Sequence, residues 1–159
     1  GVMTDGGIYI NKHGESFRRF DVKDGLGIKL LNSKKIKVAC ISGSNSSILE
    51  IRAKSLGIEI IKKGVSDKLI ELKKIQEELS YGTNETIFLG DDINDLRVIE
   101  AVSIFAVPFD AHQACKKKAN FIGKKKGGRG FIREVVDHIF VAKGINPYEP
   151  FITRNDFEI

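Results

Sequence analysis

The chain has 159 residues and a mass of 17.7 kDa, a size that favours one domain with a substantial core. Its 42% hydrophobic and 30% charged residues are typical of a globular protein, and no apolar run is long enough to span a bilayer. No signal-peptide pattern is visible, and Cys40 and Cys115 form no motif. We therefore expect a reducing, cytoplasmic setting and no membrane partner.

A net charge of +5 and an isoelectric point near 9.2 would suit a nucleic-acid-binding protein. The excess charge lies late in the chain, in the lysine runs 116–118 and 124–126. No aromatic residues alternate with these lysines, as stacking on bases would require, and lysine runs are more often solvated surface. We expect a small anionic substrate and no nucleic-acid partner, an expectation that steeply salt-dependent binding to DNA or RNA would overturn.

In chain order, the first predicted element is a β-hairpin, because the alternating segments 8–10 and 17–20 flank turn residues at 11–14. Asp24 is expected to cap the first helix. We expect the next strands over 36–41, 58–61, 86–89, 103–107 and 120–122, and helices over 24–31, 48–56, 69–79, 96–102, 111–118 and 132–139.

This alternation predicts an α/β fold with a doubly wound parallel sheet, and a small β-hairpin preceding it. Residues 1–142 are expected to form the domain. Residues 143–159 contain two of the three prolines and are expected to form an extended tail.

The most specific stretch is Gly-Asp-Asp-Ile-Asn-Asp at residues 90–95, directly after the apolar strand 86–89. In open α/β sheets, ligands bind at this carboxyl edge of the strands. Three carboxylates within five residues repel one another unless a cation lies among them, and Mg²⁺ is the cation that prefers such oxygen ligands. The alternative is a turn in which Asp92 or Asn94 caps the next helix. The density of carboxylates favours the metal site.

Two other strand ends carry polar residues that suit a phosphate. Ser42, followed by Gly43, ends the strand 36–41 and offers a hydroxyl beside backbone N–H groups. Lys68 opens the helix after the next strand, where its ammonium group can neutralise a phosphate. Taken singly, Ser42 suits a helix-capping turn and Lys68 a solvated lysine. Parallel topology brings these edges together with the acidic loop, and such a set suits phosphoryl transfer.

The order of Ser42, Lys68 and the acidic loop 90–95 resembles motifs II, III and IV of the haloacid dehalogenase superfamily. The strings at 4–9, 21–28 and 127–134 resemble one branch of it, the 3-deoxy-D-manno-octulosonate 8-phosphate phosphatases. The resemblance extends from Gly1 to about residue 140, and only the tail lies outside it.

This resemblance implies a Mg²⁺-dependent phosphomonoesterase of lipopolysaccharide biosynthesis that works through an aspartyl-phosphate. It also implies a hairpin in place of a cap domain, and a homotetramer in which a neighbouring subunit helps close each site. By this resemblance the site residues are Asp91 for the metal, Ser42, Gly43 and Lys68 for the phosphate, Arg129 for the substrate, and Asp92, Asn94 and Asp95 in supporting roles. Asp95 would support Lys68 or the metal shell.

The chain departs from the family at its start. Relatives open with an apolar strand ending in Asp-x-Asp-Gly, whose first aspartate is the nucleophile and whose second is the general acid/base. This sequence begins at what resembles that glycine, Gly1, so neither aspartate is in it. Asp5 matches a later Thr-Asp-Gly string and is not a replacement, and Ser44 stands where many relatives carry arginine. We expect the sequence to be incomplete, because without its central strand the sheet would be split and its core exposed.

Other functions fit parts of the pattern. One is a non-catalytic oligomerisation domain, like the C-terminal domain of animal acylneuraminate cytidylyltransferases, which would explain the absent aspartates. A phosphatase of nonulosonate 9-phosphates would suit the same basic, minimally capped pocket. A receiver domain shares the Asp, Ser/Thr and Lys set, but its acidic pair follows the first strand and its lysine comes late, the reverse of the order here.

Overall fold

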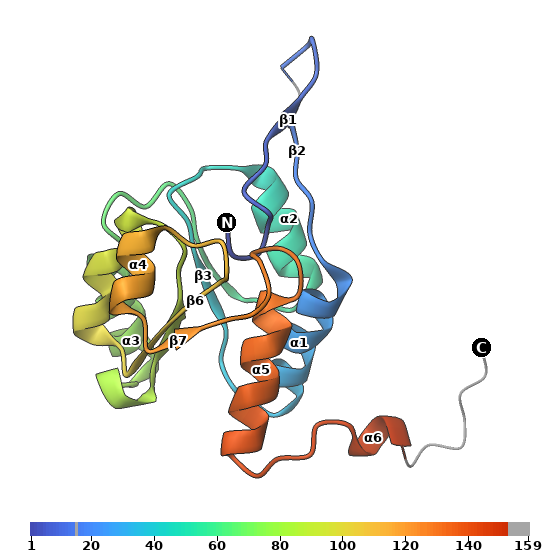
Figure 1. Ribbon diagram of the computed structural model, residues 1–159, viewed down its shortest axis with the longest axis vertical. Coiled ribbons are helices and arrows are strands. Elements are labelled where there is room, and N and C mark those ends of the chain that lie inside the picture. The colour runs from blue at the N-terminus through green and yellow to red at the C-terminus, as the bar shows by residue number, and fades with distance from the viewer. Residues whose placement is uncertain (15, 153–159) are drawn as a thin grey trace.

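The computed structural model describes residues 1–14 and 16–152 and shows helices on both sides of parallel strands, with a hairpin projecting from the body (Figure 1). The strands are β1 (Tyr9–Ile10), β2 (Ser16–Phe17), β3 (Ala39–Ile41), β4 (Ile60–Lys62), β5 (Ile87–Leu89), β6 (Ile104–Val107) and β7 (Phe121–Ile122). The helices are α1 (Val22–Ser33), α2 (Ser47–Ser55), α3 (Lys68–Leu79), α4 (Gln113–Lys118), α5 (Phe131–Ala142) and α6 (Glu149–Ile152), with 3₁₀ segments η1 (Thr83–Glu85) and η2 (Ile93–Ala101).

The parallel strands form two separate sheets. β3 pairs with β4, and β5, β6 and β7 pair in that order, all of them parallel. The α/β class is therefore confirmed. β3 and β5 each lie at the edge of their sheet, so the parallel strands of the described residues are split between two sheets, as expected.

Two apolar cores hold the helices against these strands. The core on one side joins α1, α2 and α5 through Ile28, Leu30, Leu31, Ala53, Ile132, Val136 and Phe140. The core on the other side joins α3, η2, β6 and α4 through Leu69, Leu72, Val98, Ala101, Phe105, Val107 and Cys115. The helical layers on either side of the strands agree with the doubly wound arrangement. No helix in the described ranges is both long enough and apolar enough to cross a bilayer.

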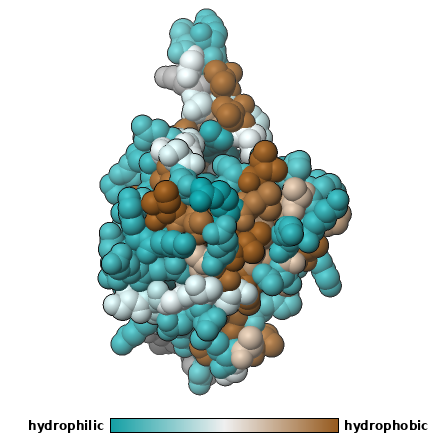
Figure 2. Space-filling view, turned by 90° about the vertical axis from the view of Figure 1, so that its left-hand side faces the viewer, coloured by the Kyte–Doolittle hydropathy of each residue, from teal (hydrophilic) through white to brown (hydrophobic). Residues whose placement is uncertain are grey.

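The predicted hairpin is present, although its strands are shorter than expected. β1 and β2 pair antiparallel, and a further bridge between Thr4 and Phe20 closes the base. The hairpin stands clear of the body (Figure 1). Below a hydrophilic tip, its strands carry exposed apolar side chains (Figure 2), among them Ile10 and Phe17, which are 67% and 61% exposed. A projecting apolar hairpin of this kind favours contact with another protein surface.

Several boundaries differ from expectation. Asp21, not Asp24, caps α1, by accepting from the N–H of Lys23. The segment after the acidic loop, η2, is 3₁₀ throughout rather than α-helical. The tail is not wholly extended, since α6 forms within it. Residues 153–159 lie outside the described residues, and the expected domain boundary after residue 142 stays a prediction.

Asp24 instead joins α1 to α5. It is 3% exposed, and its carboxylate accepts hydrogen bonds from the N–H of Gly130 at 3.1 Å and of Arg133 at 3.0 Å. Gly130, the N-cap of α5, has a positive φ of 99° and no side chain that could accept a hydrogen bond. Asp24, which belongs to α1, therefore caps the start of α5 in its place. Burial raises the pKa of the Asp24 carboxyl, and these two backbone hydrogen bonds offset part of the rise.

Asp24→Ala should lower the free energy of unfolding by about 1–3 kcal/mol, because the buried N–H of Gly130 and the partly buried N–H of Arg133 lose their acceptor. Urea titration followed by circular dichroism measures the change. The matched control is Glu78→Ala at an exposed position of α3, where we expect a change within about 0.5 kcal/mol. Equal losses in the two variants would contradict the capping role.

Candidate active site

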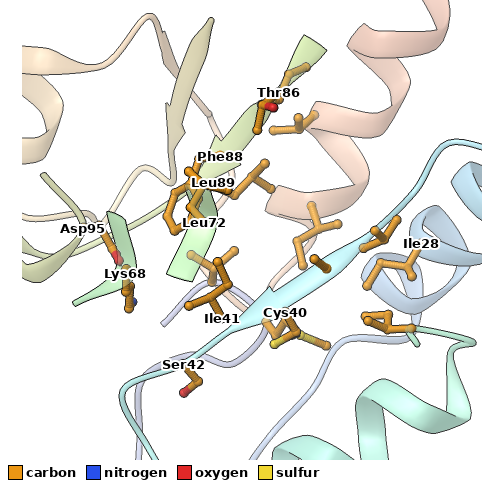
Figure 3. Close-up of a pocket in the computed structure, with 18 of the residues that line it drawn as sticks. Ile28, Cys40, Ile41, Ser42, Lys68, Leu72, Thr86, Phe88, Leu89 and Asp95 are labelled. Carbon is orange, nitrogen blue, oxygen red and sulfur yellow. Dashed lines mark hydrogen bonds and ion pairs between the residues drawn. The ribbon is translucent and has the colours of Figure 1, made fainter. Parts of the chain in front are cut away.

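The carboxyl ends of β3 and β5 meet the start of α3 at one mouth of a large cavity (Figure 3). Ser42 directly follows β3, and Lys68 is the first residue of α3. The predicted site residues that line the cavity are Ser42, Gly43, Lys68, Asp91, Asp92, Asn94 and Asp95. Residues that are far apart in the sequence thus come together as expected from parallel topology.

Asp95 holds the site together. It is 2% exposed, and its Oδ1 lies 2.5 Å from the Nζ of Lys68, which is 13% exposed. The other oxygen, Oδ2, accepts from the N–H of Asp91 at 3.0 Å and of Asp92 at 3.4 Å. Gly90 permits this approach, because a Cβ there would lie 2.8 Å from the Cβ of Asp95. These contacts favour Asp95 as the support of Lys68, the first of the two roles expected for it.

Asp92 has the helix-capping role that was the alternative to a metal site. Its Oδ1 accepts from the N–H of Ile93 at 2.8 Å, and with Asp95 it forms a capping box at the start of η2. Asn94 is exposed at the cavity. Within the described ranges, no group of three or more His, Cys, Asp or Glu side chains is arranged to hold a metal ion.

Asp91 is the carboxylate that remains for a cation. It is 28% exposed and forms an ion pair with the amino group of Gly1. Its backbone carbonyl accepts from the N–H of His112 at 2.8 Å, which fixes the loop. Mg²⁺ is commonly held by one or two carboxylates together with water and substrate phosphate oxygens. The Asp91 carboxylate at the cavity fits one position of such a set.

Ser42 is oriented by its own turn. Its backbone N–H donates to the carbonyl of Lys62 at 2.8 Å, and its Oγ accepts from the N–H of Ser44 at 3.1 Å. The N-cap of α2 is Ser46 rather than Ser42. The helix-capping alternative for Ser42 is therefore wrong, and its hydroxyl proton can be donated to a ligand in the cavity.

Arg129 lies on a loop outside the cavity lining. Its guanidinium is 53% exposed and lies 3.6 Å from the Asp5 carboxylate. The loop packs directly on the first residues of the chain, where Gly128 donates to the carbonyl of Val2 at 2.8 Å. A Cβ on Gly128 would lie 2.3 Å from the backbone of Thr4, and its φ is +60°, so glycine is required there. The structure thus places Arg129 apart from Ser42 and Lys68.

Arg18 is a cationic side chain that the sequence reasoning did not single out. It is half-buried at the base of the hairpin and lines the cavity. Its neighbour Arg19 points elsewhere, to the carbonyl of Gly128 at 2.5 Å and to Asp21. The sequence feature that could have identified Arg18 is the alternation of residues 17–20. In an extended segment adjacent side chains point to opposite sides, so Arg18 and Arg19 cannot both face the same way.

The two cysteines are free thiols and are poor nucleophiles. Burial raises the pKa of the Cys40 thiol. Burial and the nearby carboxylates of Asp95, Asp92 and Asp91 raise the pKa of Cys115 to about 11. Because only the thiolate is reactive, neither cysteine supplies a nucleophile at neutral pH.

Comparison with known proteins agrees with this geometry. Residues 28–134 match the haloacid dehalogenase-like hydrolase family. The 3-deoxy-D-manno-octulosonate 8-phosphate phosphatase of Yersinia pestis is 39% identical over 143 residues, which are 90% of this chain and 76% of that protein. Its crystal structure has a TM-score of 0.88 over 91% of this chain and 78% of that one.

Two further solved structures carry ligands that bear on the site. The 3-deoxy-D-manno-octulosonate 8-phosphate phosphatase of Moraxella catarrhalis, in complex with magnesium, phosphate and KDO, is 32% identical with a TM-score of 0.88, covering 96% of this chain and 86% of that one. The cobalt-bound phosphatase of Haemophilus influenzae is 34% identical with a TM-score of 0.86, covering 91% and 84%. The chain belongs to the haloacid dehalogenase-like hydrolases, and within that family it is a phosphoric monoester hydrolase.

Proposed function

We propose that this protein removes phosphate from a sugar-acid phosphate, 3-deoxy-D-manno-octulosonate 8-phosphate, with Mg²⁺ as its metal. The observation that carries the proposal is the meeting of Ser42, Lys68 and Asp91 at one mouth of the cavity. The names of the relatives from Yersinia pestis and Moraxella catarrhalis support the substrate, and the magnesium and phosphate of the latter support the chemistry.

Each of these side chains has a distinct role in the proposal. The hydroxyl of Ser42 and the ammonium group of Lys68 hold phosphate oxygens and offset their charge. Asp91 would hold the Mg²⁺, which when bound neutralises negative charge on the phosphate. Arg129 meets the sugar-acid carboxylate from outside the cavity, through the paired N–H groups of its guanidinium.

The nucleophile in this proposal is an aspartate on a strand that enters before Gly1. Its carboxylate attacks phosphorus, the bond to the sugar oxygen breaks, and a second aspartate protonates that oxygen. Water then attacks the aspartyl-phosphate and releases inorganic phosphate, while the second aspartate takes up the proton. Neither aspartate is among the 159 residues of this sequence.

A non-catalytic role in assembly is the second candidate. It is favoured by the exposed apolar side chains of the hairpin, with Ile8, Tyr9, Ile10 and Phe17 all more than half exposed. The same surface supports the expected homotetramer, whose mass in solution can be measured by sedimentation equilibrium. The cytoplasmic setting and the lack of a nucleic-acid partner remain part of the proposal.

The direct test joins an apolar strand ending in Asp-x-Asp before Gly1 and measures phosphate release, with Mg²⁺ and with a chelator. We expect metal-dependent hydrolysis of the octulosonate 8-phosphate in preference to a nonulosonate 9-phosphate. The reverse preference would reassign the substrate, and no hydrolysis of either would favour the assembly role.

In that joined chain, Asp91→Asn should reduce turnover by about a hundredfold or more, because the metal loses its charged ligand on this loop. Asp92→Asn is the matched control, since asparagine caps a helix as well as aspartate does. Full activity of Asp91→Asn, measured as kcat at saturating Mg²⁺, would remove Asp91 from the metal site.

Asp95→Asn should lower the free energy of unfolding of the 159-residue chain by about 3 kcal/mol, because the Lys68 ammonium group, which is 13% exposed, loses its counter-ion. Urea titration measures this, with Asp92→Asn again as the control. A loss no greater than that of the control would mean that Asp95 does not position Lys68.

Arg129→Ala in the joined chain should raise KM by about tenfold and lower kcat little, because one charged contact to bound substrate is lost. Arg129→Lys should raise KM less than Arg129→Ala does, since lysine keeps the positive charge but lacks the paired N–H groups of the guanidinium. A fall in kcat with KM unchanged would move Arg129 into the chemical step.

A further inference from the structure

The positive charge of the chain is concentrated in one segment, and the proposed site uses little of it. Residues 109–129 carry six lysines and one arginine against a single carboxylate, that of Asp110, so their formal charge is +6. The whole chain has a formal charge of +5, which leaves −1 for the remaining residues. Such a concentration of one sign creates a field that attracts anions from solution.

None of these six lysines uses its charge to hold the fold. In residues 1–14 and 16–152, no carboxylate lies within ion-pair distance of their ammonium groups, whereas Lys54, Lys62, Lys63 and Lys68 are each paired with one. Five of the six are exposed, and Lys116 is half-buried. Their charges are therefore available to a ligand.

The loop over residues 124–127 is fixed through its backbone. Both carboxylate oxygens of Glu134 accept from the N–H of Lys124 at 3.0 Å. Asp110 accepts from the N–H of Gly127 at 2.9 Å. The carboxylates beside the loop thus bond to its N–H groups and not to its ammonium groups, so the loop is held in place while its side-chain charges stay free.

This lysine loop lies beside the mouth of the cavity. The carbonyl of Lys125 accepts from the N–H of Phe109 at 2.9 Å, and three residues later the N–H of His112 donates to the carbonyl of Asp91 at 2.8 Å. The turn between them therefore joins the lysine loop to the acidic loop. Figure 1 shows the loop before α5 next to the first residues of the chain, several of which also line the cavity.

Lys116 of α4 adds its charge to the same surface. Its ammonium nitrogen lies 5.1 Å from the centroid of the Phe109 ring, a cation–π contact that holds this charge over the turn on which the lysine loop packs. Phe109 is 56% exposed, so the contact lies at the protein surface. We call Lys116, Lys124, Lys125 and Lys126 the cationic rim.

The acidic loop gives the rim a task. Asp91, Asp92 and Asp95 repel an anion that approaches the mouth, and the ammonium group of Lys68 is already paired with one of them. Four free ammonium groups beside this loop offset that repulsion. At physiological ionic strength a charge acts over about 8 Å before salt screens it, a range that suits neighbouring loops.

We propose that the cationic rim guides anionic ligands to the mouth of the cavity and thereby raises the rate at which substrate is captured. The four rim lysines do not line the cavity, so we expect no part for them in the chemical step. That the anion is a sugar-acid phosphate rests on the proposed function, whereas the attraction of anions to the mouth does not.

The first test uses the 159-residue chain and needs no hydrolysis. Nitroxide probes of similar size, one anionic and one cationic, speed the relaxation of nearby amide protons, and the ratio of the two effects reports the local potential. At about 20 mM KCl we expect amides in residues 91–94 and 124–128 to favour the anionic probe by about threefold or more. Lys124→Gln, Lys125→Gln and Lys126→Gln combined should remove most of this preference.

The matched control combines Lys29→Gln, Lys34→Gln and Lys73→Gln. These lysines are exposed, lie outside the cavity lining and remove the same charge from α1, its C-cap and α3. The control should keep the preference at the mouth. Equal losses in the two variants would mean that the net charge of the chain, and not the rim, attracts the probe, which would overturn the proposal.

The second test measures kinetics in the joined chain. The loop variant should lower kcat/KM by about fivefold at low salt and leave kcat unchanged, and the difference should disappear at about 0.5 M KCl. A fall in kcat, or a loss that persists at high salt, would overturn the proposal. Tight binding of an oligothymidylate that only the loop variant loses would assign the rim to nucleic acid and also overturn it.

The two tests separate this proposal from the proposed function. If the joined chain hydrolyses no substrate, but the probe preference is present and is lost only in the loop variant, the rim stands and the proposed function fails. If the joined chain hydrolyses substrate with the same kcat/KM in the loop variant at low salt, the proposed function stands and this proposal fails.

Discussion

The contacts of one buried carboxylate determine the arrangement of the site. Asp95 accepts from the Lys68 ammonium group and from the backbone N–H groups of Asp91 and Asp92. Removing a carboxylate from water costs several kcal/mol unless it is paired and hydrogen-bonded. The end of β5, the start of η2 and the start of α3 are therefore held together, because moving any of them would leave that charge unsatisfied. Asp95 confers geometry on the site, while Asp91 and Lys68 line the cavity.

The division of the sheet connects this site to the core. Parallel strands are normally covered on both faces and paired on both edges, as β6 is. β3 and β5 instead line the cavity, and so do the polar residues Ser42 and Asp91 that come after them. The cavity therefore joins the apolar core to the polar residues of the candidate site.

The sequence was most informative where one periodic signal dominates. α3 and α5 were predicted within a few residues, because their apolar spacing repeats over three turns. That Ser42, Lys68 and Asp91 would line one cavity was predictable because each lies at the end of a strand or the start of a helix. Capping was harder to predict: Asp21 and Asp24 both suit a helix start, and only the position of α5 shows that Asp24 serves Gly130 and Arg133. The roles of Asp92 and Asp95 likewise depend on side-chain partners that spacing does not specify.

The three carboxylates of the acidic loop differ in how their charge is offset. The Asp95 carboxylate is paired with the ammonium group of Lys68 and accepts from two backbone N–H groups. The Asp92 carboxylate accepts from the N–H of Ile93 at the start of η2. The Asp91 carboxylate is more exposed than that of Asp95 and lies at the cavity. A cation bound at Asp91 would therefore offset charge that Lys68 and the start of η2 leave in place.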